Sequence, residues 1–313
     1  MILYKYTKLE YLEKILENHS FKLSNPDEFN DPFDCLVEAD ESEKKKCFDL
    51  MMNYLFFKEM EKIFLNKEIK LRTRDKILFA FFILELKLTK STIKKYKFYN
   101  KMPMFNGLIK LGAKYKQGQN INDKIDKAKL EFSKMIETQI KEIRDSLLIC
   151  CYGRRNDSIL MWSHYANCHK GVCIEFEPYD DVDATEVKYS NRRARLDLYS
   201  IIQTVLAYDY LQEKVDIRNK NVVRNLLKPF SIKSKDWKYE EEYRSVYSKN
   251  EFNEKITSLD DKYFINAGNI KAIYLGCRVS MEDEKMARKI ARNIPIYKMK
   301  ESGRKYQVVS LKN

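Results

Sequence analysis

The chain has 313 residues, of which 44% are hydrophobic and 13% aromatic, and its formal net charge is +13 at pH 7. This composition is typical of a folded protein rather than a disordered one, and eight glycines and six prolines are too few for long flexible linkers. The positive charge favours polyanionic partners, because binding to a polyanion releases its counterions.

The cysteines and the apolar runs favour a cytoplasmic location. Seven cysteines at irregular spacing do not resemble the even-numbered disulfide framework of a secreted protein. Residues 1–8 lack the apolar core of a signal peptide, and the longest apolar run, residues 77–84, is too short to cross a bilayer. We therefore expect a soluble cytoplasmic protein with no membrane partner.

The chain opens with a strand, a helix and a second strand. Residues 2–6 and 21–24 read as extended segments, and residues 9–17 carry apolar side chains at helical spacing. Residues 25–34 then combine two prolines with five Asx residues, a composition that forms ordered turns through hydrogen bonds from side chain to backbone. We predict a structured loop there and call it the Asx loop.

Residues 41–146 are predicted to form a large helical insertion within a single domain that spans residues 1–313. The helical pattern is interrupted near residues 66–68, at Pro103 and around residues 112–119. Between residues 86 and 149, fifteen Lys or Arg stand against six Asp or Glu, and residues 94–99 alternate cations with aromatics. This basic block predicts either a nucleic-acid surface or a solvated helical face.

Strand character resumes after the insertion, so a mixed or antiparallel β core flanks the helices and the fold class is α+β. The predicted strands cover residues 147–152, 171–176, 184–189, 239–247, 270–276, 294–299 and 305–310. The predicted helices cover residues 196–211, 219–227 and 281–293.

The strand predicted at residues 239–247 carries a candidate catalytic group. Residues two apart on a strand share a face, so Glu240, Glu242 and Arg244 would point the same way. Adjacent carboxylates perturb each other, and a pair that lines a cleft suits glycosyl transfer. The alternative is structural: Arg244 pairs with Glu242 on a sheet surface and Glu240 is solvated.

A second cluster surrounds His164. Trp162 and Tyr165 are either core residues or a stacking platform for a base or a nicotinamide ring, and His164 is either partly buried or a hydrogen-bonding group in a site. The series His164, Cys168, His169 and Cys173 lacks the paired spacing of zinc ligands, so we predict no metal. No phosphate-binding loop, dinucleotide fingerprint or nucleophile elbow is present.

Four motifs together resemble the bacterial family catalogued as domain of unknown function 2971. They are Leu-Tyr-Lys-Tyr at residues 3–6, Phe-Asn-Asp-Pro-Phe-Asp at 29–34, the segment from Met161 to Phe176, and Trp-Lys-Tyr-Glu-Glu-Glu-Tyr-Arg at 237–244. The helical block carries none of them. This resemblance implies a family but no activity.

The order of elements is also similar to the ADP-ribosyltransferase fold, with its split sheet and its catalytic glutamate on a late strand. The resemblance implies NAD as substrate and Glu242 as the catalytic residue with Glu240 assisting. His164 is a further catalytic candidate on its residue type alone. For NAD binding it implies Tyr4, Lys5 or Tyr6 on the first strand and Tyr165 near the nicotinamide. The further candidates for NAD binding are Asn30 and Asp31 in the Asx loop, Trp162 and Arg244.

Three functions are therefore open. The first hypothesis is an ADP-ribosyltransferase-like enzyme that uses NAD to modify a macromolecule, and nucleic acid is the leading candidate for that macromolecule. Such an enzyme would act as a toxin or phage-defence effector, controlled by an antitoxin or a regulatory protein. The second is a metal-independent nuclease with His164 as general acid or base and Lys5 or Arg244 on the phosphate. The third is a non-catalytic module that binds a nucleotide or a partner protein.

Overall fold

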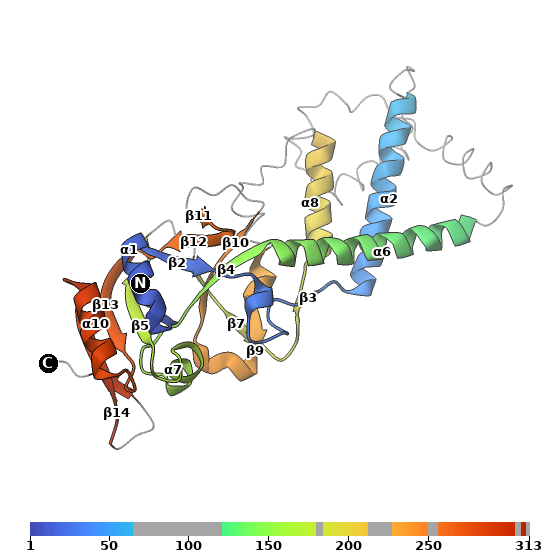
Figure 1. The fold of residues 1–313 in the computed structure, drawn as a ribbon. Coiled ribbons are helices and arrows are strands. Elements are labelled where there is room, and N and C mark those ends of the chain that lie inside the picture. Colours follow the sequence, from blue (N-terminus) through green and yellow to red (C-terminus); the bar gives the residue numbers. More distant parts are fainter. Residues whose placement is uncertain (65–120, 180–183, 212–226, 250–255, 304–307, 311–313) are drawn as a thin grey trace. The chain divides into compact units, whose positions relative to one another are not determined.

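The structure is a computed structural model that describes residues 1–64, 121–179, 184–211, 227–249, 256–303 and 308–310 (Figure 1). Several predictions fall outside these residues: the basic and aromatic segment 94–99, the three helix interruptions, and residues 219–226 of one predicted helix. The predicted α+β class is confirmed, because helices and mostly antiparallel sheets are both present.

The chain folds into two compact units. Unit 1 comprises Met1–Val37, Lys141–Ala194 and Leu227–Asn313, and unit 2 comprises Glu38–Ile140 and Arg195–Leu226. The short strands β3 (Val37–Glu38) and β8 (Ala194–Arg195) lie where the chain passes from one unit to the other. Unit 2 thus draws on residues 195–226 as well as the predicted insertion, and the single-domain organisation stays a prediction.

The largest sheet of unit 1 has five strands in the order β1-β5-β13-β14-β15. Neighbouring strands are antiparallel except for β13 and β14, which are parallel and are connected through helix α10 (Met281–Ala291). The strands are β1 (Leu3–Thr7), β5 (Val172–Glu177), β13 (Asn269–Leu275), β14 (Ile296–Glu301) and β15 (Val308–Ser310).

Two smaller sheets complete the core of unit 1. One has the order β4-β10-β6, formed by Leu147–Tyr152, Tyr243–Ser248 and Ala184–Glu186, and the other has the order β11-β12-β2, formed by Ile256–Leu259, Lys262–Asn266 and Ser20–Leu23. Isolated bridges connect β4 to β1 and to β2. Tyr4 of β1 exchanges backbone hydrogen bonds with Gly153, which follows β4, and Ser24, which follows β2, exchanges them with Ile149 of β4. This arrangement brings β1, β4 and the end of β2 together.

Short helices connect these strands. Helix α1 (Leu12–Asn18) follows a 3-10 turn at Leu9–Tyr11, and helix α7 (Ile159–Tyr165) begins at its N-cap Ser158, whose hydroxyl accepts from the Met161 N–H. Within the Asx loop, the Asn25 side chain caps a 3-10 turn at Pro26–Glu28. These elements confirm the predicted strand, helix, strand opening and the structured loop.

Two strand predictions were wrong in part. The strand predicted over residues 184–189 is two strands, β6 and β7 (Lys188–Ser190), because β6 pairs with β10 whereas β7 pairs with β9 (Ile232–Ser234). Residues 235–240 form the 3-10 helix η5 (Lys235–Glu240), capped by Ser234, and Glu241 has a positive φ of 44°. The expected strand therefore begins only at Tyr243.

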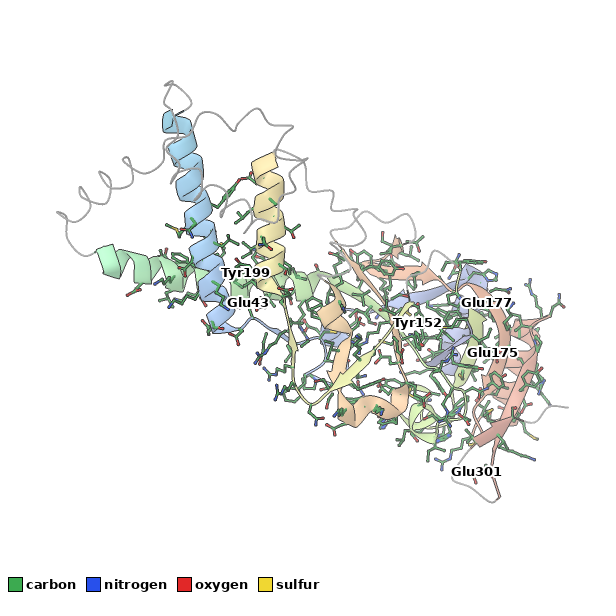
Figure 2. All side chains as sticks on the ribbon, turned by 180° about the vertical axis from the view of Figure 1, so that it is seen from behind. Glu43, Tyr152, Glu175, Glu177, Tyr199 and Glu301 are labelled. Atoms are coloured by element: carbon green, nitrogen blue, oxygen red, sulfur yellow. The ribbon has the colours of Figure 1, made fainter. Side chains whose placement is uncertain are left out.

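Unit 2 is helical in its described part. Helices α2 (Glu41–Phe64) and α8 (Leu198–Leu211) pack through Leu50 and Tyr54, and the Tyr199 N–H donates to the Glu43 carboxylate (Figure 2). Helix α6 (Ile121–Ser146) packs on α2 through the rings of Phe48 and Phe132, whose centres are 5.7 Å apart. No helix among the described residues is both long enough and apolar enough to cross a membrane.

Candidate functional site

A cavity of about 360 Å³ opens in unit 1 between strands β1 and β4, the Asx loop, helix α7 and helix η5. Its volume is in the range of small-molecule sites, roughly 300–1,000 Å³. Its lining combines aromatic rings with a group of ionisable side chains. The lining includes Tyr4, Lys5, Tyr6, Phe29, Asn30, Asp34, Tyr152, His164, Tyr165, Lys233, Glu240 and Glu242.

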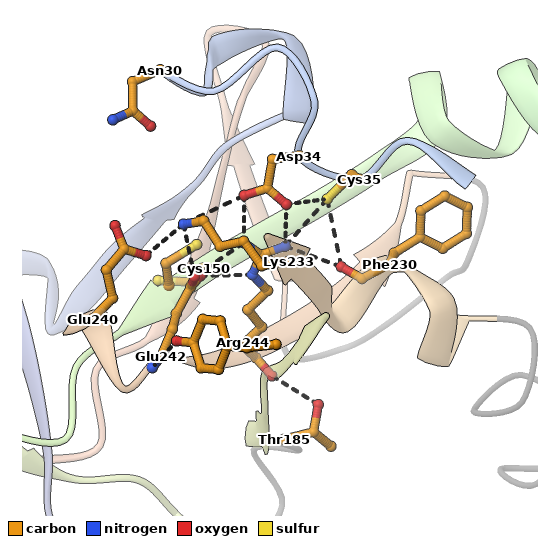
Figure 3. A network of polar contacts seen from close by, with 12 residues as sticks. Asn30, Asp34, Cys35, Cys150, Thr185, Phe230, Lys233, Glu240, Glu242 and Arg244 are labelled. Atoms are coloured by element: carbon orange, nitrogen blue, oxygen red, sulfur yellow. Dashed lines mark hydrogen bonds and ion pairs between the residues drawn. The ribbon is translucent and has the colours of Figure 1, made fainter. Parts of the chain in front are cut away.

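Five charged side chains form a buried network at this cavity: Asp34, Lys233, Glu240, Glu242 and Arg244 (Figure 3). Each is less than 9% exposed, although side chains of these types are rarely buried unless they are paired. The network joins three carboxylates to two cations. We call it the buried charge network.

Arg244 is the fully buried centre of this network and is 0% exposed. Its terminal nitrogens make a bidentate pair with Asp34 at 2.8 and 2.5 Å, and its Nε donates to Glu242 Oε1 at 2.6 Å. It also donates to the Phe230 carbonyl at 3.0 Å. The planar guanidinium therefore fixes two carboxylates at once, a geometry that a lysine could not reproduce.

Lys233 bridges the three carboxylates from the other side. Its Nζ lies 2.5 Å from Glu240 Oε2, 3.1 Å from Glu242 Oε2 and 3.6 Å from Asp34 Oδ2. The residue is held on strand β9 (Ile232–Ser234), which pairs in parallel with β7, and its Nζ also lies 5.0 Å from the Trp237 ring centre. Lys233 and Arg244 together hold Glu242 between two cations.

The pKa values of the two glutamates are shifted in opposite directions. Burial tends to raise the pKa of Glu242, but the charges of Arg244 and Lys233 outweigh burial and hold this pKa well below its usual range. Burial raises the pKa of Glu240, and the nearby Glu242 adds to this effect against the opposing charge of Lys233. When the pKa values of two neighbouring carboxyl groups are shifted in opposite directions, the group with the lower pKa can stabilise charge and the other can transfer a proton.

Tyr165 connects the network to the Asx loop. Its hydroxyl donates to Glu240 Oε1 at 2.6 Å, and the Asn30 amide donates to the Tyr165 oxygen at 3.5 Å. The Asx loop is in turn anchored by Asn25, whose side-chain amide donates to the carbonyls of Asp145 and Leu147 at 2.9 and 3.0 Å. Helix α7 and the loop therefore position one wall of the cavity.

Lys5 lies on a different wall, on strand β1. Its Nζ donates to the Cys151 carbonyl at 2.9 Å and to the Cys150 sulfur at 3.4 Å, and it lies 5.7 Å from the centre of the Tyr152 ring. Among the described residues it forms no ion pair within 4.0 Å. Lys5 thus keeps a positive charge at the cavity that its own contacts do not neutralise.

His164 is exposed at the cavity and packs against aromatic rings. The centres of the Trp237, Tyr239 and Tyr165 rings lie 6.3, 6.2 and 6.2 Å from its own. These contacts connect helix α7 to helix η5. The predicted crowding of aromatics around His164 is therefore present, and its main new member is Trp237.

The structure brings together eight of the eleven predicted site residues. Glu240, Glu242, His164, Tyr4, Lys5, Tyr6, Asn30 and Tyr165 all line the cavity. Asp31, Trp162 and Arg244 do not. Asp31 holds the loop backbone by accepting from the Phe33 N–H at 2.9 Å, Trp162 is buried with its Nε1 donating to the Asn156 carbonyl, and Arg244 lies behind the glutamates.

Two expectations about the glutamate segment need correction. In the structural alternative the pairing of Arg244 with Glu242 is confirmed, but its surface location and the solvated Glu240 are wrong, because all three side chains are buried. The shared strand face is also wrong, since Glu240 lies in η5. The side chains still converge because the left-handed residue Glu241 turns the chain between them.

Neither Lys233 nor a role for Asp34 was predicted from the sequence. Asp34 belongs to the predicted Asx loop, whose composition indicates ordered turns. Lys233 is one of 59 Lys and Arg residues, and nothing in its neighbourhood marks it as buried. Its contacts depend on the pairing of β9 with β7.

Residues 161–245 match the family model described as protein of unknown function (DUF2971). No curated protein and no solved structure matches the chain. The motifs at residues 3–6 and 29–34 lie outside the matched segment, which contains His164 and Tyr165 as well as four of the five network residues. Through that segment the predicted resemblance is confirmed, and the chain resembles DUF2971, a family of unknown function.

Proposed function

We propose that the cavity is the active site of an ADP-ribosyltransferase-like enzyme that uses NAD to modify a macromolecule. Nucleic acid is the leading candidate for that macromolecule. The observation that carries the proposal is the pair of buried carboxylates, Glu240 and Glu242, whose pKa values are shifted in opposite directions. The cavity volume is suited to the nicotinamide and its ribose. Such an activity is consistent with a toxin or phage-defence effector.

The two carboxylates would have different tasks. Nicotinamide leaves with the electron pair of its bond to the ribose C1′, and positive charge develops on the ribose. Glu242, kept ionised by Arg244 and Lys233, would stabilise that charge without having to lose a proton. As the acceptor oxygen or nitrogen bonds to C1′, its proton would pass to Glu240.

The rest of the lining supports binding of NAD. Tyr4, Phe29 and Tyr165 offer aromatic surfaces for the nicotinamide ring, and Asn30 offers an amide for its carboxamide group. Lys5 is the cavity cation without an ion-pair partner in the described part of the chain, which suits it to the pyrophosphate. Asp31, Trp162 and Arg244 would act by positioning these residues.

The test is nicotinamide release and label transfer from NAD in the presence of DNA, RNA and cell extract. We expect Glu242→Gln to lower turnover by at least about 100-fold, because it removes a preorganised charge from the reaction centre. Glu241→Gln is the matched control, since Glu241 lies between the two glutamates but is exposed and 3.6 Å from Arg155.

The outcome separates the three functions. Equal NAD turnover in Glu242→Gln and Glu241→Gln would rule out the carboxylate mechanism. Cleavage of nucleic acid without NAD, lost in His164→Ala, would assign the nuclease instead. No turnover together with nucleotide binding would assign a binding module.

A further inference from the structure

Phe33 is an exposed aromatic side chain on a rigid part of the Asx loop. It is 65% exposed, although the nearby Asn30 and the adjacent Asp34 both line the cavity. Its N–H donates to the Asp31 carboxylate at 2.9 Å, and the Asp34 N–H donates to the Asp31 carbonyl at 3.1 Å. Because Asp34 is also paired with Arg244, the loop backbone at Phe33 is held next to residues that line the cavity.

Arginines extend this surface from the end of strand β7. The Arg193 guanidinium lies 5.9 Å from the Phe33 ring centre, and the Arg192 N–H donates to the Ser190 hydroxyl at 3.0 Å. Strands β7 and β9 are parallel, with Ser190 opposite Ser234. Parallel strands end at the same edge of their sheet, so Lys235, which follows Ser234, lies at the same edge as the arginines.

Helix η5 carries the surface back to the cavity. Lys235 and Lys238 are exposed, while the ring of Trp237 packs at 6.3 Å on that of His164, a cavity residue. The carboxylate in this turn is Asp236, which accepts from the Ser234 hydroxyl at 2.8 Å. We call Phe33, Arg192, Arg193, Lys235, Trp237 and Lys238 the aromatic-basic edge, and it borders the cavity at Phe33 and at Trp237.

The geometry points to the aromatic-basic edge as a binding surface for single-stranded nucleic acid. The exposed cations Arg192, Arg193, Lys235 and Lys238 complement a phosphate backbone, and the exposed phenyl ring of Phe33 offers a face on which a base can stack. Stacking on Phe33 requires a base that is free of its own duplex, which selects single strands over duplexes.

A single strand of nucleic acid bound at the aromatic-basic edge would lie next to the cavity. The role of the bound nucleic acid as acceptor of ADP-ribose rests on the proposed function. The binding of single-stranded nucleic acid to the edge does not depend on that function. Binding is therefore measured with the full chain and without NAD, so a failure of binding and a failure of the carboxylate mechanism are separate results.

The experiment is fluorescence anisotropy with labelled single-stranded DNA, single-stranded RNA and a duplex of the same sequence at several salt concentrations. We expect Phe33→Ala to weaken binding of single strands about tenfold, and Phe33→Trp to retain binding. Arg192→Gln with Arg193→Gln should reduce the slope of log K against log salt by about 1.4, whereas Phe33→Ala should leave this slope unchanged.

Matched controls lie elsewhere on unit 1. Leu259→Ala removes an apolar side chain that is also 65% exposed, and Arg288→Gln with Lys289→Gln removes two exposed charges from α10. These variants should bind like the parent chain. The proposal is overturned if the parent does not bind single strands, if it prefers the duplex, or if the edge variants lose no more affinity than their controls.

Discussion

At the scale of single residues, Lys233 is a buried cation surrounded by carboxylates. It is 6% exposed and contacts three carboxylates, so its charge is compensated only by other buried charges. Removing one partner of a buried ion pair leaves an uncompensated charge, which costs far more than the loss of a surface pair. The carboxylates are therefore as dependent on Lys233 as it is on them.

We expect Lys233→Met to lower the free energy of unfolding by about 3–5 kcal/mol, because Glu240 and Glu242 lose a shared cation. Urea unfolding measures the change. Lys235→Met, two residues away and exposed, should change the free energy by less than about 0.5 kcal/mol. Equal stability of the two variants would show that the buried charge network does not hold these side chains together.

Glu242 should make the fold sensitive to acid. Burial acts to raise its pKa, but Arg244 and Lys233 lower it well below the usual 4.5. Its stabilising contribution is therefore complete above the unfolded pKa of about 4.5 and is lost as the pH falls toward the folded pKa. Urea unfolding between about pH 3 and pH 6 should show a smaller loss of stability on acidification in Glu242→Gln than in the parent chain.

Glu240 should act with the opposite sign. Its pKa is raised in the fold, chiefly by burial, so the folded state binds its proton more tightly and gains stability as the pH falls. Glu240→Gln removes this compensation and should make the acid loss steeper, while Glu241→Gln should parallel the parent chain. A pH dependence that is the same in all four proteins would contradict the opposed shifts of the two glutamates.

At the scale of elements, the Asx loop is the best example of local sequence that determines local structure. Asn25 caps the turn at Pro26–Glu28 and also donates to two carbonyls at the junction of α6 and β4, so one side chain both forms the loop and attaches it. Asn30 and Asp34, farther along the loop, reach the cavity from this anchor.

Asn25→Ala should lower the free energy of unfolding by about 1–2 kcal/mol and also impair the site, because the loop loses its cap and its attachment. Ser280→Ala is the matched control: it removes the N-cap of α10, where Ser280 accepts from the Asp283 N–H at 3.0 Å. Both variants should lose stability in thermal unfolding. Under the proposed function, only Asn25→Ala should also raise the KM for NAD. A raised KM in both would assign the effect to general destabilisation.

At the scale of the whole molecule, the site is assembled in unit 1 from segments that are distant along the chain. Arg244 and Asp34 are separated by 210 positions, and the antiparallel pairing of β10 with β4 brings the glutamate segment to the strand that also bridges β1. Unit 2 has its own buried cluster around Leu50 and Tyr54. The cavity lining comes entirely from unit 1.

The predicted opening elements, β4, β5, β13 and α10 are present because apolar periodicity and capping act over a few residues. The glutamate segment shows the limit of such patterns. Residues 239–247 were predicted to form one strand, yet Ser234 caps a helical turn that includes Tyr239 and Glu240, and Glu241 adopts a left-handed conformation. The convergence of Glu240 with Glu242 was predicted for a reason that proved wrong.

The α+β class, most of the elements of unit 1, the structured Asx loop and the family resemblance could be predicted from the sequence, since they depend on short-range patterns and on motifs. The burial of Arg244, the contacts of Lys233 and Asp34 that complete the network, and the place of Trp162 in the core became known only from the fold. Burial and ion pairing depend on which strands become neighbours, and strand pairing across hundreds of residues leaves no local signal.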